Sequence, residues 1–402
     1  MKIAQISPLR RAAPAAVAVL TAATLTVAAP AARADSAWTV GSSPFTLGTS
    51  ALYGVSAAAP DAVTIGGYQW ASSRRGIFCG VIGGPCSPTV HQNPVLQERN
   101  GGGWSMTSTP GLPGKGQIQF VDAVSATDVW AAGSRDTANG KGSGTPYVAR
   151  SGAQGWQEVA VPPGLRVLES FDGDAAGAWL GGEAALHGGT SVYRWADGTW
   201  TPHALDAVIQ GVRQRAADDV WAVGRVPKGG GAPERGYAAR FDGTTWHTMT
   251  PPQVQGKGGR LVAVLPLAAD DVWITGYVFE NGVRKDASYH WNGSEWREDV
   301  LPGGARFGGG IHHISSANAN YYLYYPDGLV DDGAGGLWAV PSLPVTRGEP
   351  QILRYTSGSW RLEQTATGVQ GEIRGIARVP GTSTLWAVGQ RDGKDPLVLT
   401  NG

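Results

Sequence analysis

Short segments in which apolar and polar residues alternate recur along almost the whole chain. In one copy, Ile209-Gln210-Gly211-Val212 precedes Asp218-Asp219-Val220-Trp221-Ala222-Val223-Gly224, and a further alternating run then leads through Asp242-Gly243 to Trp246. Alternation with a period of two indicates half-buried β-strands, and Asp-Gly between two such runs is a strong hairpin signal. One unit therefore predicts four short antiparallel strands.

The phrase around Trp221 repeats along the sequence. Residues 128–133 and 270–276 are close copies, and looser ones follow Ala178, Leu337 and Leu385, while Val63 replaces the tryptophan in a seventh. Each unit also closes with a second tryptophan, and these seven are Trp38, Trp104, Trp156, Trp200, Trp246, Trp296 and Trp360. Four-stranded units that recur about every 45 to 50 residues predict β-propeller blades, and no segment has the 3.6-residue period of a helical solenoid.

The two ends of the chain predict how the ring closes. Residues 397–402 have a third strand and an Asn-Gly turn but no fourth strand, whereas 35–38 read as a fourth strand without a blade before it. If the N-terminal strand completes the seventh blade, no open sheet edge remains at the seam. We therefore expect an all-β fold, one seven-bladed β-propeller over residues 35–402. Its blades are expected near residues 47–109, 117–162, 165–206, 207–254, 259–302, 309–365, and 371–402 joined with 35–46.

The repeated Asp-Val-Trp-Ala-Val-Gly phrase resembles the Asp-box or BNR-like propeller repeats, and more narrowly those of exported bacterial propellers that carry it in blade after blade. The resemblance covers essentially all of residues 35–402 and implies the propeller fold. Such propellers include glycan-binding proteins, assembly factors and hydrolases, so the resemblance implies no single activity. The full Asp-box, Ser-x-Asp-x-Gly-x-Thr-Trp, is absent, and residues 241–246 come nearest to it.

Residues 1–34 have the pattern of a secretory signal peptide. Lys2, Arg10 and Arg11 precede an apolar run, and Ala32-Arg33-Ala34 offers small residues to a signal peptidase. We expect cleavage after Ala34 and a secreted protein, exported by the general secretory route or, given the arginine pair, by the twin-arginine route. No later segment approaches the length of a membrane span, so we expect no stable membrane insertion.

Charge and cysteine content restrict the classes of partner and the covalent links to be expected. Residues 1–34 hold four of the 32 basic residues and none of the 32 acidic ones, which leaves 28 against 32, a net charge of −4. Without a basic stripe, nucleic acid is not an expected partner. Cys79 and Cys86 are predicted to form a local disulfide in the oxidising exported setting. We expect no cofactor, no metal site and, outside a complex, a monomer.

Residues that recur once per unit are interpreted as structural. The repeated tryptophans are expected to form the core between blades. Asp128, Asp219 and Asp271 are expected to cap turns through their side chains. Arginines that recur before the hairpin turns are expected to pack over an aromatic ring or to form a structural ion pair, and they are Arg99, Arg150, Arg194, Arg240 and Arg354.

Two departures from the repeat carry the candidate binding residues. The first is the loop from Tyr68 to Asn93, where a contact surface would use Trp70, Arg74 and Arg75 beside the predicted disulfide; the alternative is a decorated loop without a partner. The second is in the sixth unit, where an insertion follows two histidines; the alternative is an added hairpin that packs on the blade. Its candidate residues are His312, His313, Tyr321, Tyr322, Tyr324 and Tyr325.

The motifs of common catalytic classes are absent. The chain has no Gly-x-Ser-x-Gly elbow, no His-Glu-x-x-His and no phosphate-binding Gly-x-x-x-x-Gly-Lys-Ser/Thr. We therefore assign no catalytic residue and expect a secreted, non-catalytic binding module, lectin-like or protein-binding, that engages a cell-envelope glycan or a partner protein. It would act alone or as a subunit of a secreted complex. The alternative is a propeller enzyme that acts on polysaccharide as a glycoside hydrolase or lyase.

Overall fold

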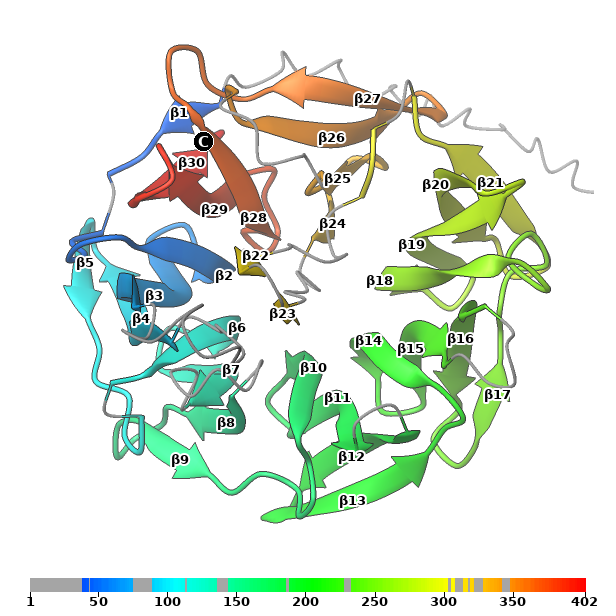
Figure 1. The fold of residues 1–402 in the computed structure, drawn as a ribbon, viewed down its shortest axis with the longest axis horizontal. Coiled ribbons are helices and arrows are strands. Elements are labelled where there is room, and N and C mark those ends of the chain that lie inside the picture. The colour runs from blue at the N-terminus through cyan, green and yellow to red at the C-terminus, as the bar shows by residue number, and fades with distance from the viewer. Residues whose placement is uncertain are drawn as a thin grey trace, which may run out of the picture. The chain divides into compact units, whose positions relative to one another are not determined.

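The computed structural model describes residues 38–42, 44–74, 89–112, 114–135, 144–185, 188–227, 233–302, 305–307, 314–316, 319–321, 328–341 and 348–402. Within them, the strands form seven four-stranded antiparallel sheets and one two-stranded hairpin. The sheets follow one another as the blades of a β-propeller (Figure 1), and the innermost strands of successive blades contact one another all the way round. The expected seven-bladed fold is confirmed. No helix in these ranges is long and apolar enough to cross a membrane.

The first four blades have their strands in chain order from the inside to the outside of the ring. Blade one comprises β2 (Ala51–Ala59), β3 (Ala62–Arg74), β4 (Thr89–Asn100) and β5 (Gly103–Met106). Blade two comprises β6 (Gly116–Ser125), β7 (Asp128–Arg135), β8 (Thr145–Arg150) and β9 (Gln157–Val159). Blade three comprises β10 (Val167–Gly173), β11 (Ala178–Ala185), β12 (Gly188–Ala196) and β13 (Thr199–Ala204). Blade four comprises β14 (Val208–Ala216), β15 (Asp219–Val226), β16 (Arg235–Phe241) and β17 (Trp246–Thr248).

The remaining three blades include the seam of the ring. Blade five comprises β18 (Gly258–Ala268), β19 (Asp271–Glu280), β20 (Val283–Trp291) and β21 (Trp296–Val300). The hairpin that follows it comprises β22 (Ile314–Ser316) and β23 (Ala319–Tyr321). Blade six comprises β24 (Leu329–Asp331), β25 (Leu337–Ala339), β26 (Gln351–Thr356) and β27 (Ser359–Gln364). Blade seven comprises β28 (Gly371–Arg378), β29 (Leu385–Arg391), β30 (Asp395–Thr400) and β1 (Thr39–Val40).

The N-terminal strand closes the ring. In blade seven the strand order is β1-β30-β29-β28, with Thr39 opposite Thr400 and Val40 opposite Leu399. The backbone N–H of Gly41 extends the ladder by donating to the carbonyl of Val398 over 3.0 Å. The seam predicted from the two chain ends is therefore present, and its outer strand comes from the other end of the sequence.

Tryptophans pack between neighbouring blades as the repeat predicts. The tryptophan of a second strand meets the closing tryptophan of the next blade edge to face in four places, a favoured geometry for aromatic pairs. These pairs are Trp386 with Trp104, Trp179 with Trp246, Trp221 with Trp296, and Trp338 with Trp38. Trp38 thus takes in blade seven the place that Trp104 takes in blade one. Each of the seven interfaces between neighbouring blades has a cluster of buried apolar side chains.

Blade six differs from the sequence interpretation at its innermost strand. Blade six was expected to begin near residue 309, with the tyrosine-rich insertion following His312 and His313, but the four-stranded sheet begins at Leu329. The N–H of Val340 donates to the carbonyl of Gly328 over 2.8 Å, so Gly328 holds the place that Gly211 has in blade four. Residues 314–316 and 319–321 instead pair with each other as the separate hairpin β22–β23, before this blade in the sequence. The residue opposite Val340 therefore comes directly before β24.

Six innermost strands contain a β-bulge near their first residues. The pairing of β2 with β3 skips one residue between Leu52 and Gly54, and the same shift occurs in β6, β10, β14, β18 and β28. A Cβ on Gly54 would lie 2.9 Å from the carbonyl oxygen of Gln119 in the next blade, so the strands approach closely here. A bulge re-aims a side chain out of the regular alternation. The extra residues are Tyr53, Gln119, Glu169, Gln210, Val262 and Arg374.

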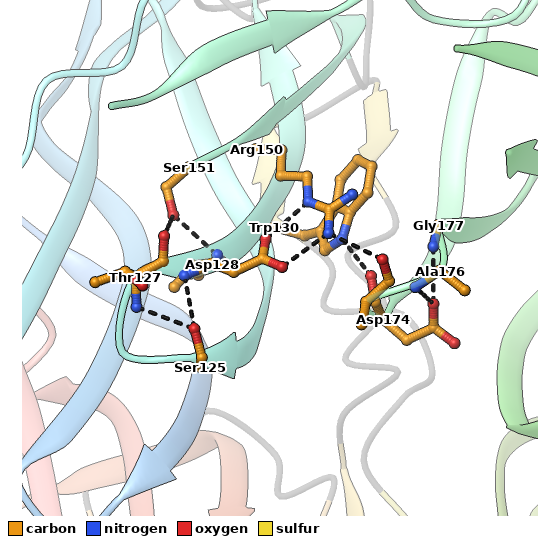
Figure 2. A network of polar contacts seen from close by, with 11 residues as sticks. Ser125, Thr127, Asp128, Trp130, Arg150, Ser151, Asp174, Ala176 and Gly177 are labelled. Atoms are coloured by element: carbon orange, nitrogen blue, oxygen red, sulfur yellow. Dashed lines mark hydrogen bonds and ion pairs between the residues drawn. The ribbon is translucent and has the colours of Figure 1, made fainter. Parts of the chain in front are cut away.

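A polar network joins blade two to blade three at the turn between their first two strands (Figure 2). The guanidinium of Arg150 donates to both carboxylate oxygens of Asp128 over 2.7 and 2.8 Å and lies 4.6 Å from the centre of the Trp130 ring. The indole N–H of Trp130 donates to the carbonyl of Asp174 over 3.0 Å. The turn itself is capped by Ser125 Oγ, which accepts from the backbone N–H of Asp128. All these donors are satisfied, so the network is structural.

The corresponding aspartates of other repeats also accept from side chains, but from different partners. The prediction that Asp128, Asp219 and Asp271 cap turns is wrong, because their carboxylates accept from side chains. Asp219 and Asp271 accept from the indole N–H two residues on, and their further partners are Arg240 and His290. The structural role of the recurring arginines is confirmed, since they form ion pairs or lie over tryptophan rings. Ring contacts are made by Arg99, Arg150, Arg194 and Arg354.

Candidate functional site

The bulge residues of blades three and four mark the candidate site. Glu169 is the extra residue of β10, Gln210 is that of β14, and the two strands are neighbours along the inside of the ring (Figure 1). The side chains are 5% and 0% exposed. A glutamate and a glutamine at the same buried position of adjacent blades are not needed by the propeller fold, because blade five has Val262 there.

A chain of ion pairs runs past this position from blade three to blade five. Arg225 donates to Glu183 over 3.2 Å and, through its other terminal nitrogen, to Glu234 over 3.0 Å. Arg260 then donates to the second oxygen of Glu234 over 2.8 Å. Glu183 follows Gly182 in β11 and Arg225 follows Gly224 in β15, so corresponding positions of blades three and four supply opposite charges.

The buried end of this chain is incompletely hydrogen bonded. Among the described residues, Glu169 Oε2, both side-chain atoms of Gln210 and the Nε of Arg225 are buried without a partner. Buried polar groups in native proteins are nearly always bonded, and each unpaired group costs about 1–3 kcal/mol. The unpaired atoms comprise both donors and acceptors. They are therefore suited to a ligand that supplies both.

Electrostatics single out Glu169 within the group. Burial, and to a smaller extent the nearby Glu183 carboxylate, raise the pKa of its carboxyl to about 8, although Arg225 and Arg260 act to lower it. The same couplings place the Glu169 carboxyl within the charged chain. A carboxyl group with so high a pKa carries its proton at neutral pH. Titratable groups perturbed by burial and by named neighbours are typical of functional sites.

The corresponding position in blade seven is better satisfied. Arg374 is the bulge residue there, and it donates to Glu372 over 2.7 Å and to Gln390 over 3.0 Å. Gln390 in turn donates to the carbonyl of Ser50 in blade one over 2.8 Å, and the Arg374 guanidinium lies 5.0 Å from the Tyr53 ring centre. These contacts join the two blades at the seam. None of these contacts leaves an unpaired acceptor of the kind found at Glu169 and Gln210 in blades three and four.

Trp70 provides a second feature on the same face of the ring. It lies where the pairing of β3 with β4 shifts register, its φ is 55°, and its side chain is 54% exposed. Its N–H donates to the carbonyl of Leu47 over 2.8 Å, and Phe45, two residues before Leu47, is 73% exposed. A left-handed backbone is costly for a bulky residue, and such strain clusters at binding sites.

Most binding residues predicted from the sequence cannot be placed in the structure. Arg75, Cys79, Cys86, His312, His313, Tyr322, Tyr324 and Tyr325 lie outside the described residues. Arg74 ends β3 and Tyr321 ends β23, where the structure describes the backbone alone. Their binding roles and the disulfide therefore stay predictions. Within the described ranges, no three His, Cys, Asp or Glu side chains converge as a metal site.

The sequence interpretation missed Glu169, Gln210, Glu183 and Arg225. It searched for insertions between the repeats, whereas these residues occupy fixed positions inside them. For Glu183 and Arg225 the sequence holds a signal, since the residue after the second-strand glycine varies in type between the repeats. It is Tyr68, Ser134, Glu183, Arg225, Tyr277 or Gln390.

Comparison with known proteins gives the fold. No protein-family model matches the chain, and no curated protein matches its sequence. The structure of YCF48 bound to a D1 peptide is 13% identical with a TM-score of 0.50, and the match covers 90% of this chain and 96% of that one. The β-propeller domain of the Trilobed protease from Pyrococcus furiosus is 6% identical with a TM-score of 0.54, covering 88% and 93%. At these identities the two matches show the propeller fold alone.

Proposed function

We propose that this protein is a binding module that recognises a polypeptide segment. The single observation that carries the proposal is the buried group of unpaired donors and acceptors formed by Glu169, Gln210 and Arg225. A polypeptide supplies N–H and C=O groups along its whole length and can satisfy both kinds at once. The exposed Trp70 adds an aromatic contact of the kind enriched in protein interfaces.

The comparison supports a polypeptide as partner. YCF48, a propeller of the same fold, was solved with a D1 peptide bound to it. The proposal takes from that structure only the class of ligand. The residues proposed to recognise the ligand are those of this chain.

The proposed place of action is outside the cell. The pattern of residues 1–34 supports export and cleavage after Ala34. Mass spectrometry of the protein recovered from the medium of a producing cell should then give an N-terminus at Asp35. An intracellular protein that begins at Met1 would contradict this.

A peptide selection tests the binding function. Peptides selected from a random displayed library on the full propeller should bind it in solution with micromolar affinity by calorimetry. The W70A and E234Q variants should each weaken binding at least tenfold, about 1.4 kcal/mol, because Trp70 is exposed and Glu234 is the most exposed member of the charged chain. The proposed site would be rejected if both folded variants bound the peptides as tightly as the wild type does, or if the selection gave no binding peptide.

The tyrosine segment is compared in the same experiment. A double variant with Tyr322→Ala and Tyr324→Ala removes the aromatic groups predicted from the sequence to form a platform. If this variant loses binding while W70A and E234Q retain it, the site belongs to that segment. If it binds as the wild type does, that prediction is wrong.

One observation favours a polysaccharide-cleaving enzyme as the second candidate. A protonated Glu169 beside Glu183 resembles the unlike carboxyl pair that glycosidases use as acid and base. Incubation with a panel of polysaccharides, followed by a reducing-end assay, separates the two functions. Turnover that disappears in E169Q would establish the enzyme in place of the binding module.

A further inference from the structure

The inner end of the charged chain has more carboxyl groups than cations. The carboxyl groups are those of Glu169, Glu183 and Glu234, and the cations are those of Arg225 and Arg260. Both guanidinium groups bind Glu234, and Arg225 also binds Glu183. Glu169 is therefore left with an oxygen that has neither a cation nor a hydrogen-bond donor. A buried carboxyl in this position holds a proton in place of a counterion.

We propose that Glu169 and Gln210 form the receptor for a cationic side chain, a lysine or arginine of the bound polypeptide. The inference rests on the peptide-binding function and adds the chemistry of the residue that is recognised. The ligand's N–H groups donate to Glu169 Oε2 and to the side-chain oxygen of Gln210, two acceptors that have no donor in the structure. The ligand's charge takes the place of the proton, which Glu169 releases to solvent.

The surroundings favour a cation over the other ligand classes. An anion at Glu169 would be repelled by the neighbouring Glu183, whereas Arg225 is already neutralised by its two carboxylate partners. An uncharged side chain would supply no counterion, and the buried Glu169 would keep its proton. Glu234, whose side chain is 30% exposed, is the part of the charged chain that solvent reaches most.

The test compares two small probes that differ only in the presence of an ammonium group. Nα-acetyl-lysine N-methylamide should bind the full propeller with a millimolar Kd in an NMR titration, and Nα-acetyl-norleucine N-methylamide, which lacks the ammonium group, should bind at least tenfold more weakly. E169Q should reduce binding of the lysine probe at least tenfold. E158Q is the matched control. Glu158 lies on the outer strand β9 of blade two, where it pairs with Arg135 of β7, and this variant should bind the probe as the wild type does.

The pH dependence of binding distinguishes a Glu169 that contacts the ligand from one that is only structural. The charged groups coupled to Glu169 come from three strands: Glu183 on β11, Arg225 on β15 and Arg260 on β18. Because the ligand binds the ionised carboxyl, the Kd of the lysine probe should fall roughly 50-fold from pH 6 to pH 8, while the ammonium stays charged. E169Q should show no such change.

The outcomes separate this inference from the proposed function. If the two probes bind alike, or if folded E169Q binds the lysine probe as the wild type does, the cation receptor is rejected. Should selected peptides still bind in that case and depend on Trp70 and Glu234, the binding function stands with another recognised residue. If the lysine probe binds as expected but no peptide does, the cation site stands and the polypeptide partner is rejected.

Discussion

At the scale of single residues, equivalent aspartates of the repeat, Asp219 and Asp271, differ in burial and in partners. Asp219 is almost fully buried and accepts from the indole N–H of Trp221 over 3.0 Å and from Arg240 over 2.6 Å. Asp271 occupies the same place in blade five, but its side chain is 43% exposed and its third-strand partner is His290. The same aspartate of the repeat is therefore expected to contribute more to stability in blade four than in blade five.

Replacing the two aspartates should show this difference. D219A removes the partner of a buried indole N–H and of Arg240, so it should lower the free energy of unfolding by about 3 kcal/mol. D271A should cost about 1 kcal/mol, since solvent reaches the groups left behind. Urea unfolding of both variants measures the two values. Equal losses would show that burial does not control the contribution of this aspartate.

Trp70 supports a prediction that separates stability from binding. W70G relieves a φ of 55°, which costs a bulky residue on the order of 1 kcal/mol, so the melting temperature should stay within about 2 °C of the wild type. Binding of selected peptides should nevertheless fall at least tenfold. A W70G protein that is destabilised and binds normally would show that Trp70 is a structural residue.

At the scale of strands, the sequence could predict the blades but not their innermost positions. Alternation, Asp-Gly and Asn-Gly turns and the repeated tryptophans fixed the strand count and the role of Trp38, because these signals are local. The bulges that place Glu169 and Gln210 depend on how one innermost strand meets the next, which no single strand encodes. The aspartates were misjudged because capping is a local preference, whereas Arg240 and Trp221 reach Asp219 through the fold.

The seam strand supports the prediction at this scale. β1 has two residues, but Trp38 before it packs on Trp338 and Gly41 after it donates to Val398. Deleting residues 35–46 should leave the outer edge of β30 unpaired and lower the melting temperature by 10 °C or more in a calorimetric scan. An unchanged melting curve would show that the ring is held without this strand.

At the scale of the whole molecule, Glu169 should make stability depend on pH. In the unfolded chain a glutamate loses its proton near pH 4.3, whereas the folded protein keeps it until about pH 8. The folded state therefore binds the extra proton between these values, and this contribution is complete below about pH 4 and declines as the pH rises towards 8, by up to about 1.4 kcal/mol per pH unit.

E169Q isolates that contribution, since glutamine does not titrate. The free energy of unfolding of E169Q relative to wild type should increase by on the order of 3 kcal/mol between pH 5 and pH 8. Urea unfolding at the two pH values gives the difference, and the remaining carboxyl groups cancel in the comparison. A constant difference would mean that Glu169 ionises normally in the folded protein.

The pairing of β1 with β30 also sets the timing of folding. Thr39 and Thr400 bond across 361 positions of sequence, and a ribosome adds about 5–20 residues per second. The first strand to be made therefore waits on the order of 20 to 70 s for its partner, while six blades are completed behind it. Nascent chains stalled on a C-terminal extension long enough to carry β30 out of the ribosome should consequently resist protease, whereas chains stalled before β30 has emerged should be cleaved.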